Sequence, residues 1–151
     1  MFTLAAIMML LFFLASHYDR YFFLLHFLEA LIYIAVLLLL FYRLEEWAYV
    51  IGFLAPLFWV VLTLLSGTLL HGFNAMEQLL RLEKVTDPLD AVIAMLLVTA
   101  LALATRSARV FWNQVWGSPG ALRPVLGGIA VVAVYYLVIV ATLWRMVTPT
   151  G

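Results

Sequence analysis

The chain alternates between long hydrophobic runs and short polar stretches. A helix needs about 20 apolar residues to cross a membrane core of about 30 Å, and runs close to this length recur along the whole chain. The runs end at charged residues, Gly or Pro, which suit turns at the membrane surface. We therefore predict transmembrane helices at residues 2–18, 21–42, 47–70, 89–105 and 124–146.

The first run is the shortest. Its residues 2–16 make roughly 23 Å of helix at 1.5 Å per residue, which is less than the thickness of the membrane core. A cleaved signal peptide is the alternative interpretation. The run has no positively charged start, and residues 14–16 (Leu-Ala-Ser) make a poor cleavage site. We therefore predict a retained first helix and five spans in total, or four if this run does not cross.

Residues 71–88 are too polar to cross the membrane. Asn74 precedes Glu77 by three residues, which is the spacing of a helix N-cap with a capping box. Apolar side chains then fall on one side and charged ones on the other, so we predict an amphipathic helix at about 74–85, lying in the membrane interface. A structured polar loop is the alternative.

Three local signals predict further details of the helices. Asp87 and Pro88 suit the N-cap and the first helical position of the fourth span. This helix has the composition to continue past residue 105 into the interface, up to a break at residues 117–120. Gly127 and Gly128 near the start of the last span permit close packing against another helix.

Composition supports the same class of protein. Of the 151 residues, 68% are hydrophobic and only 11% are charged, against about 25% in an ordinary soluble domain. The net charge is zero, which offers no electrostatic basis for binding nucleic acid, and the absence of cysteine excludes disulfides and thiolate metal sites. We predict an all-α polytopic membrane helix bundle that forms one domain over residues 1–151.

Five spans would place the two termini on opposite membrane faces. We call the N-terminal face A and the opposite face B. Each face then carries four basic side chains, so the positive-inside rule does not separate them. The free amino terminus adds a charge to face A, and on this ground we predict a cytoplasmic N-terminus.

The polar residues with chemical potential gather near face B. His26, Glu29 and Tyr33 follow i, i+3, i+7 spacing, so they share one side of the second helix. His17 ends the first predicted span and His71 the third, and Asp19 lies on the same face. No comparable group exists near face A.

Four interpretations of this group remain open. The first is a metal site formed by His17, His26, Glu29 and His71, although the di-iron motif of helix bundles runs Glu-x-x-His, the reverse of the order here. The second is a haem or quinone site, with His26 and His71 as axial ligands or Tyr33 beside a quinone. The third is proton movement through Glu29, assisted by His26 and Asp19. The fourth is a purely structural polar contact within the bundle.

The sequence contains no arrangement of nucleophile and base, no phosphate-binding loop, and no motif that specifies a cofactor. We therefore predict a small non-catalytic subunit or accessory protein of a larger membrane assembly, such as an electron-transfer complex. Its expected partners are the lipid bilayer and either other membrane subunits or further copies of itself. The alternative is a self-contained protein that binds a metal, haem or quinone, or moves protons, through the His/Glu group.

Overall fold

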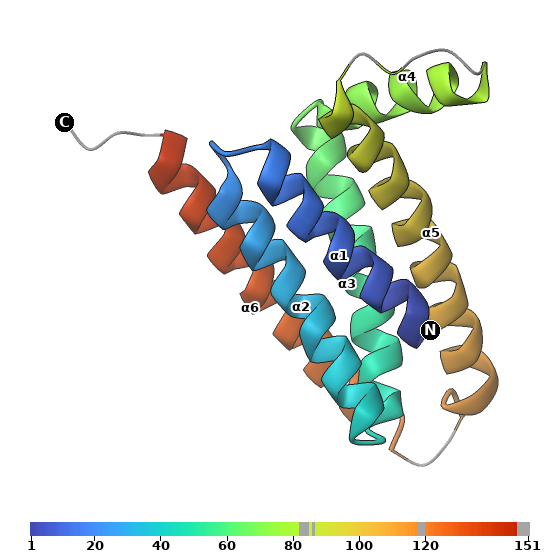
Figure 1. The fold of residues 1–151 in the computed structure, drawn as a ribbon. Helices are drawn as coiled ribbons and strands as arrows, with labels where there is room; N and C mark the ends of the chain where they lie inside the picture. Colours follow the sequence, from blue (N-terminus) through green and yellow to red (C-terminus); the bar gives the residue numbers. More distant parts are fainter. Residues whose placement is uncertain (82–84, 86, 118–119, 148–151) are drawn as a thin grey trace.

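Helices account for all the regular structure in the computed structural model, which describes residues 1–81, 85, 87–117 and 120–147. The helices are α1 (Phe2–Tyr18), α2 (Phe23–Phe41), α3 (Glu45–Leu65), α4 (Thr68–Leu80), α5 (Pro88–Gln114) and α6 (Leu122–Val147). Five of them run along one bundle, and α4 crosses one end of it (Figure 1). The predicted all-α bundle is confirmed.

Four helices are long and apolar enough to cross a membrane: α2, α3, α5 and residues 122–145 of α6. The first run does form a helix over the predicted residues, but α1 has only 17 residues, or about 25 Å at 1.5 Å per residue. The protein is therefore a membrane-embedded bundle with four full-length apolar helices and one shorter apolar helix inside it.

The short helix α1 is central to the packing, since it lies against both α2 and α5. Its fully buried residues Ala5, Met8, Phe12 and Ala15 recur every three or four positions and so form one face. The Phe12 ring stacks on Tyr33 of α2 with centroids 5.6 Å apart. The same ring meets Trp59 of α3 edge-on at 5.7 Å. These contacts make an aromatic centre that joins three helices.

Glycine allows α6 to approach α3 closely. A Cβ atom at Gly127 would overlap the Trp47 ring, and one at Gly128 would overlap Val50. Farther along the same pair of helices, the Tyr136 hydroxyl donates a hydrogen bond of 2.7 Å to the Ala55 carbonyl. The predicted close packing at the two glycines is confirmed.

The boundary between α3 and α4 differs from the prediction. The third span ends at Leu65 instead of residue 70, because Gly67 adopts φ +78°, a conformation that glycine tolerates and that ends the helix. A contact between the hydroxyls of Ser66 and Thr68 crosses this turn.

The new helix starts at Thr68, so Asn74 lies inside α4 and the predicted N-cap at Asn74 is wrong. For the same reason His71 belongs to α4 and not to the end of the third span. Leu69, Gly72 and Ala75 are buried against the bundle, whereas Phe73 and Leu80 are exposed, as is Glu77. Apolar side chains therefore lie on the outer side of α4 as well. Residues 82–84 of the predicted interfacial helix lie outside the described residues.

The fourth span begins and extends as predicted. The Asp87 side chain accepts a hydrogen bond of 2.9 Å from the Leu89 N–H, which caps the first turn behind Pro88. The helix continues past residue 105 to Gln114. The predicted break at residues 117–120 contains positive φ angles at Gly117 and Gly120, and its residues 118 and 119 lie outside the described part.

The glycine contact between α6 and α3 gives a stability prediction. Replacing Gly128 by Leu forces a side chain into the space of Val50, so we expect a loss of about 1–3 kcal/mol from overpacking. Ala130→Leu is the matched control, because Ala130 lies on the exposed side of the same helix. Thermal unfolding in detergent measures both, and equal melting temperatures would contradict the packing shown here.

Candidate functional site

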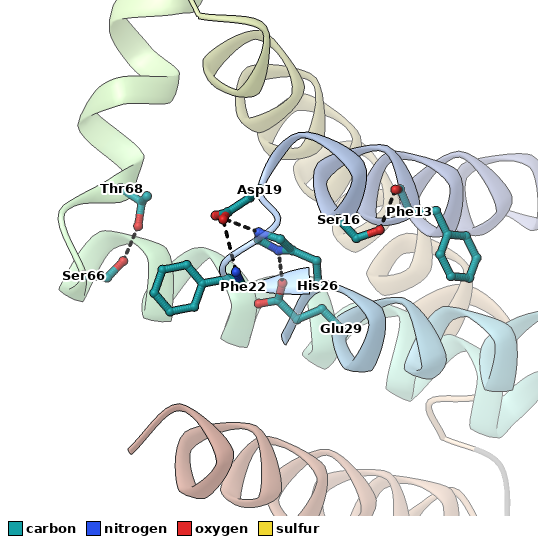
Figure 2. Close-up of polar contacts among 8 residues, drawn as sticks. All are labelled: Phe13, Ser16, Asp19, Phe22, His26, Glu29, Ser66 and Thr68. Atoms are coloured by element: carbon teal, nitrogen blue, oxygen red, sulfur yellow. Dashed lines mark hydrogen bonds and ion pairs between the residues drawn. The ribbon is translucent and has the colours of Figure 1, made fainter. Parts of the chain in front are cut away.

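A short turn between α1 and α2 brings Asp19 over the start of α2. The Asp19 N–H still donates to the Ala15 carbonyl at 2.8 Å, so the residue closes the last turn of α1. Its carboxylate oxygen Oδ1 accepts a hydrogen bond of 3.1 Å from the Phe22 N–H. The turn is therefore held by Asp19 itself, and the other oxygen of the carboxylate is directed toward α2 (Figure 2).

His26 lies between two carboxylates and uses both ring nitrogens. Its Nδ1 is 3.0 Å from Oε2 of Glu29, one turn farther along α2. Its Nε2 is 3.5 Å from Oδ2 of Asp19. Figure 2 shows the three side chains in a row from the turn into α2. We call Asp19, His26 and Glu29 the face-B triad.

Burial increases along the triad from the bundle end inward. The side chains of Asp19 and His26 are 21% and 18% exposed, and that of Glu29 is 9% exposed. Tyr33, one turn beyond Glu29, has no exposed surface. A carboxylate in an apolar bundle is costly unless it is neutralised or hydrogen-bonded, so His26 is the group that makes the position of Glu29 tolerable.

Tyr33 follows Glu29 along α2 at the inner end of the triad. The Tyr33 hydroxyl is buried and has no hydrogen-bond partner within the described part of the chain. Tyr135 and Tyr136 belong to α6, which packs against α2. Tyr33 is therefore the tyrosine that shares a helix with His26 and Glu29.

The structure brings together two of the four residues predicted as metal ligands. His26 and Glu29 are in contact, whereas His17 and His71 are exposed and belong to other helices, and the His17 ring packs edge-on against Tyr18. Within the described ranges, no group of three or more His, Cys, Asp or Glu residues is arranged to hold a metal ion.

Three surface grooves lie away from the triad. Surface grooves of about 460, 300 and 280 Å³ lie at the α2–α3 turn, along α4, and between α1, α4 and α5. None of these three grooves is lined by the triad or by Tyr33. Tyr33, which we predicted as a quinone neighbour, stacks on Phe12 within the aromatic centre.

Asp19 is the residue that the predicted ligand set omitted. The sequence placed it on the same membrane face, but nothing in its spacing indicated contact with His26. That contact depends on how tightly the chain turns between α1 and α2.

Comparison with known proteins adds no family to this description. No family model, no curated protein and no solved structure matches the chain. The fold and the site together define a small membrane-embedded helix bundle that carries a partly buried acid–imidazole–acid triad near one end.

The triad gives a prediction about coupled stability. His26→Leu removes the partner of a buried carboxyl, so we expect a loss of about 1–3 kcal/mol. The double variant His26→Leu with Glu29→Leu removes both polar groups, and it should recover part of that loss. The third variant of this double-mutant cycle is Glu29→Leu alone. Thermal unfolding of all three variants in one detergent gives the three losses of stability. Strictly additive losses would show that the two side chains do not interact.

Proposed function

We propose that this protein moves protons through the face-B triad. The observation that carries the proposal is the continuous row Asp19–His26–Glu29, in which burial rises from the bundle end toward its interior. Ionisable residues within membrane helices are rare, and those that carry protons commonly form chains of carboxylates and imidazoles. This interpretation uses every polar contact of the triad, and it requires neither a cofactor nor a cavity.

Imidazole suits the middle position because it can accept a proton on one ring nitrogen and release a proton from the other. A proton from the head-group region first joins the Asp19 carboxylate and then passes to Nε2 of His26. The imidazolium is flanked by two carboxylates, which stabilise its charge. The Nδ1 proton then moves to Oε2 of Glu29, and His26 returns to its neutral form. Glu29 completes the transfer by giving its proton to water that enters the bundle from face A, because no other carboxylate or imidazole follows it along α2.

The two links of this row differ in length. The distance of 3.0 Å between His26 and Glu29 is that of an ordinary hydrogen bond. The 3.5 Å between His26 and Asp19 is longer, so transfer across it requires a small rotation of the Asp19 side chain. We propose that this rotation of the Asp19 side chain limits the rate of the relay. With face A on the cytoplasmic side, as we also propose, protons would arrive at Asp19 from outside.

Proton flux into liposomes tests the proposal. The purified protein is reconstituted with a pH-sensitive dye inside, and a potassium diffusion potential drives proton uptake. We expect Glu29→Gln and His26→Leu to lower the flux at least about tenfold, because neither replacement can pass a proton.

His71→Gln is the matched control, since His71 is an exposed histidine in α4 near the same end of the bundle. Its flux should equal that of the wild type. Equal flux in the wild type, the triad variants and protein-free liposomes would overturn the proposal.

A second proposal is that the chain serves as a small subunit of a larger membrane assembly. The supporting observation is the wide apolar surface of α6, which packs against α3 and α2 and leaves large side chains exposed along its length. These include Leu126, Ile129, Val134 and Leu137. Such a surface can contact lipid or the helices of other subunits.

Native mass spectrometry of the protein, extracted from its own membranes in mild detergent, tests this second proposal. Added mass in whole protein subunits, lost on replacing Val134 and Leu137 by polar residues, is the expected result. A lone chain or a homo-oligomer would contradict it and would leave the proton relay unaffected.

A further inference from the structure

Tyr33 carries a polar group that the packing of the bundle does not explain. Its side chain is fully buried, and its hydroxyl has no hydrogen-bond partner among the residues that the structure describes. Buried hydroxyl groups are almost always hydrogen-bonded, because leaving them unpaired costs stability. A phenylalanine would fill the same space without that cost, so the hydroxyl calls for a reason beyond packing.

The position of the hydroxyl suggests its partner. Tyr33 follows Glu29 by four residues on α2, so the two side chains lie on the same side of the helix one turn apart. Only one oxygen of the Glu29 carboxyl is engaged by His26. The Tyr33 ring is fixed by its stack on Phe12, so any adjustment between the two groups belongs to Glu29 and to the phenolic O–H.

We propose that the Tyr33 hydroxyl is the inner hydrogen-bond partner of Glu29 during proton transfer. The hydroxyl is unpaired in the resting arrangement that the structure shows, and it accepts a hydrogen bond from the Glu29 carboxyl O–H only when His26 delivers its proton. The phenolic proton stays on its own oxygen throughout, so no phenolate forms. Tyr33 is thus a positioning residue that holds the protonated Glu29 carboxyl toward the bundle centre during the transfer. This inference rests on the proposed proton relay.

The neighbouring phenols do not take this role. The Tyr136 hydroxyl already donates to the Ala55 carbonyl of α3 at 2.7 Å. The Tyr135 hydroxyl is also buried without a hydrogen-bond partner among the described residues, but Tyr135 lies on α6 and not on the helix that carries the triad. Tyr33 alone shares the side of α2 on which His26 and Glu29 lie.

A purely structural role and the proposed role predict opposite results for Tyr33→Phe. If the ring only fills space, removing an unpaired hydroxyl leaves both function and stability intact or raises the stability. If the hydroxyl positions Glu29, function falls although the stability does not. Tyr136→Phe is the matched control, because it removes a buried phenolic hydroxyl whose partner is structural.

The experiment measures three quantities on the wild type and on the two variants in liposomes: proton flux, melting temperature, and the infrared carbonyl band of protonated Glu29. The band is identified by its loss in Glu29→Gln. For Tyr33→Phe we expect at least about a fivefold loss of flux, a melting temperature no lower than that of the wild type, and a carbonyl band at higher frequency because a hydrogen bond is lost. For Tyr136→Phe we expect a lower melting temperature, retained flux and an unchanged band.

Wild-type flux in Tyr33→Phe with an unchanged Glu29 band would overturn the inference. So would a lower melting temperature for Tyr33→Phe, since it would assign the hydroxyl a structural partner. These results are distinct from failure of the relay itself, which would show as wild-type flux in Glu29→Gln.

Discussion

The placement of one imidazole between two carboxylates is the interaction on which the candidate site depends. Glu29 lies in an apolar part of α2, where an unpaired carboxyl would oppose folding and insertion. His26, on the same helix, is the hydrogen-bond partner of Glu29. Asp19, in the turn, lies beside the other ring nitrogen of His26. The turn must be short for this, because Asp19 both closes α1 and accepts the hydrogen bond from Phe22 that leads into α2.

The rest of the bundle encloses the inner end of this row. Phe12 of α1 fixes the Tyr33 ring, and Trp59 of α3 fixes Phe12 in turn. On the other side, glycine lets α6 come close to α3, and the Tyr136 hydrogen bond holds that approach near its middle. The short helix α1 is therefore needed for the site even though it is the least suited to cross a membrane.

The end of α3 shows how local signals compete. Ser66-Gly67 and Asn74 are both ordinary boundary signals, and the sequence offers no local reason to prefer one of them. In the structure, Gly67 has a positive φ and α3 ends just before it. The chain then turns, α4 crosses the end of the bundle, and Gly72 packs against Ile93 of α5. The contacts between α4 and α5 accompany this choice, and the α5 residues that make them lie far from the turn in the sequence.

The sequence alone determined the class of the protein and the positions of its long helices. Lipid requires each spanning segment to satisfy its own backbone hydrogen bonds, so apolar length predicts each span without knowledge of its neighbours. The shared side of His26, Glu29 and Tyr33 was likewise predictable, because it follows from the helical repeat. Only the tertiary structure decided that the Asp19 carboxylate lies beside His26, that α6 packs against α2, and that His17 and His71 stay apart. Those relations depend on how each helix is rotated against the others, and rotation is set by packing between residues distant in sequence.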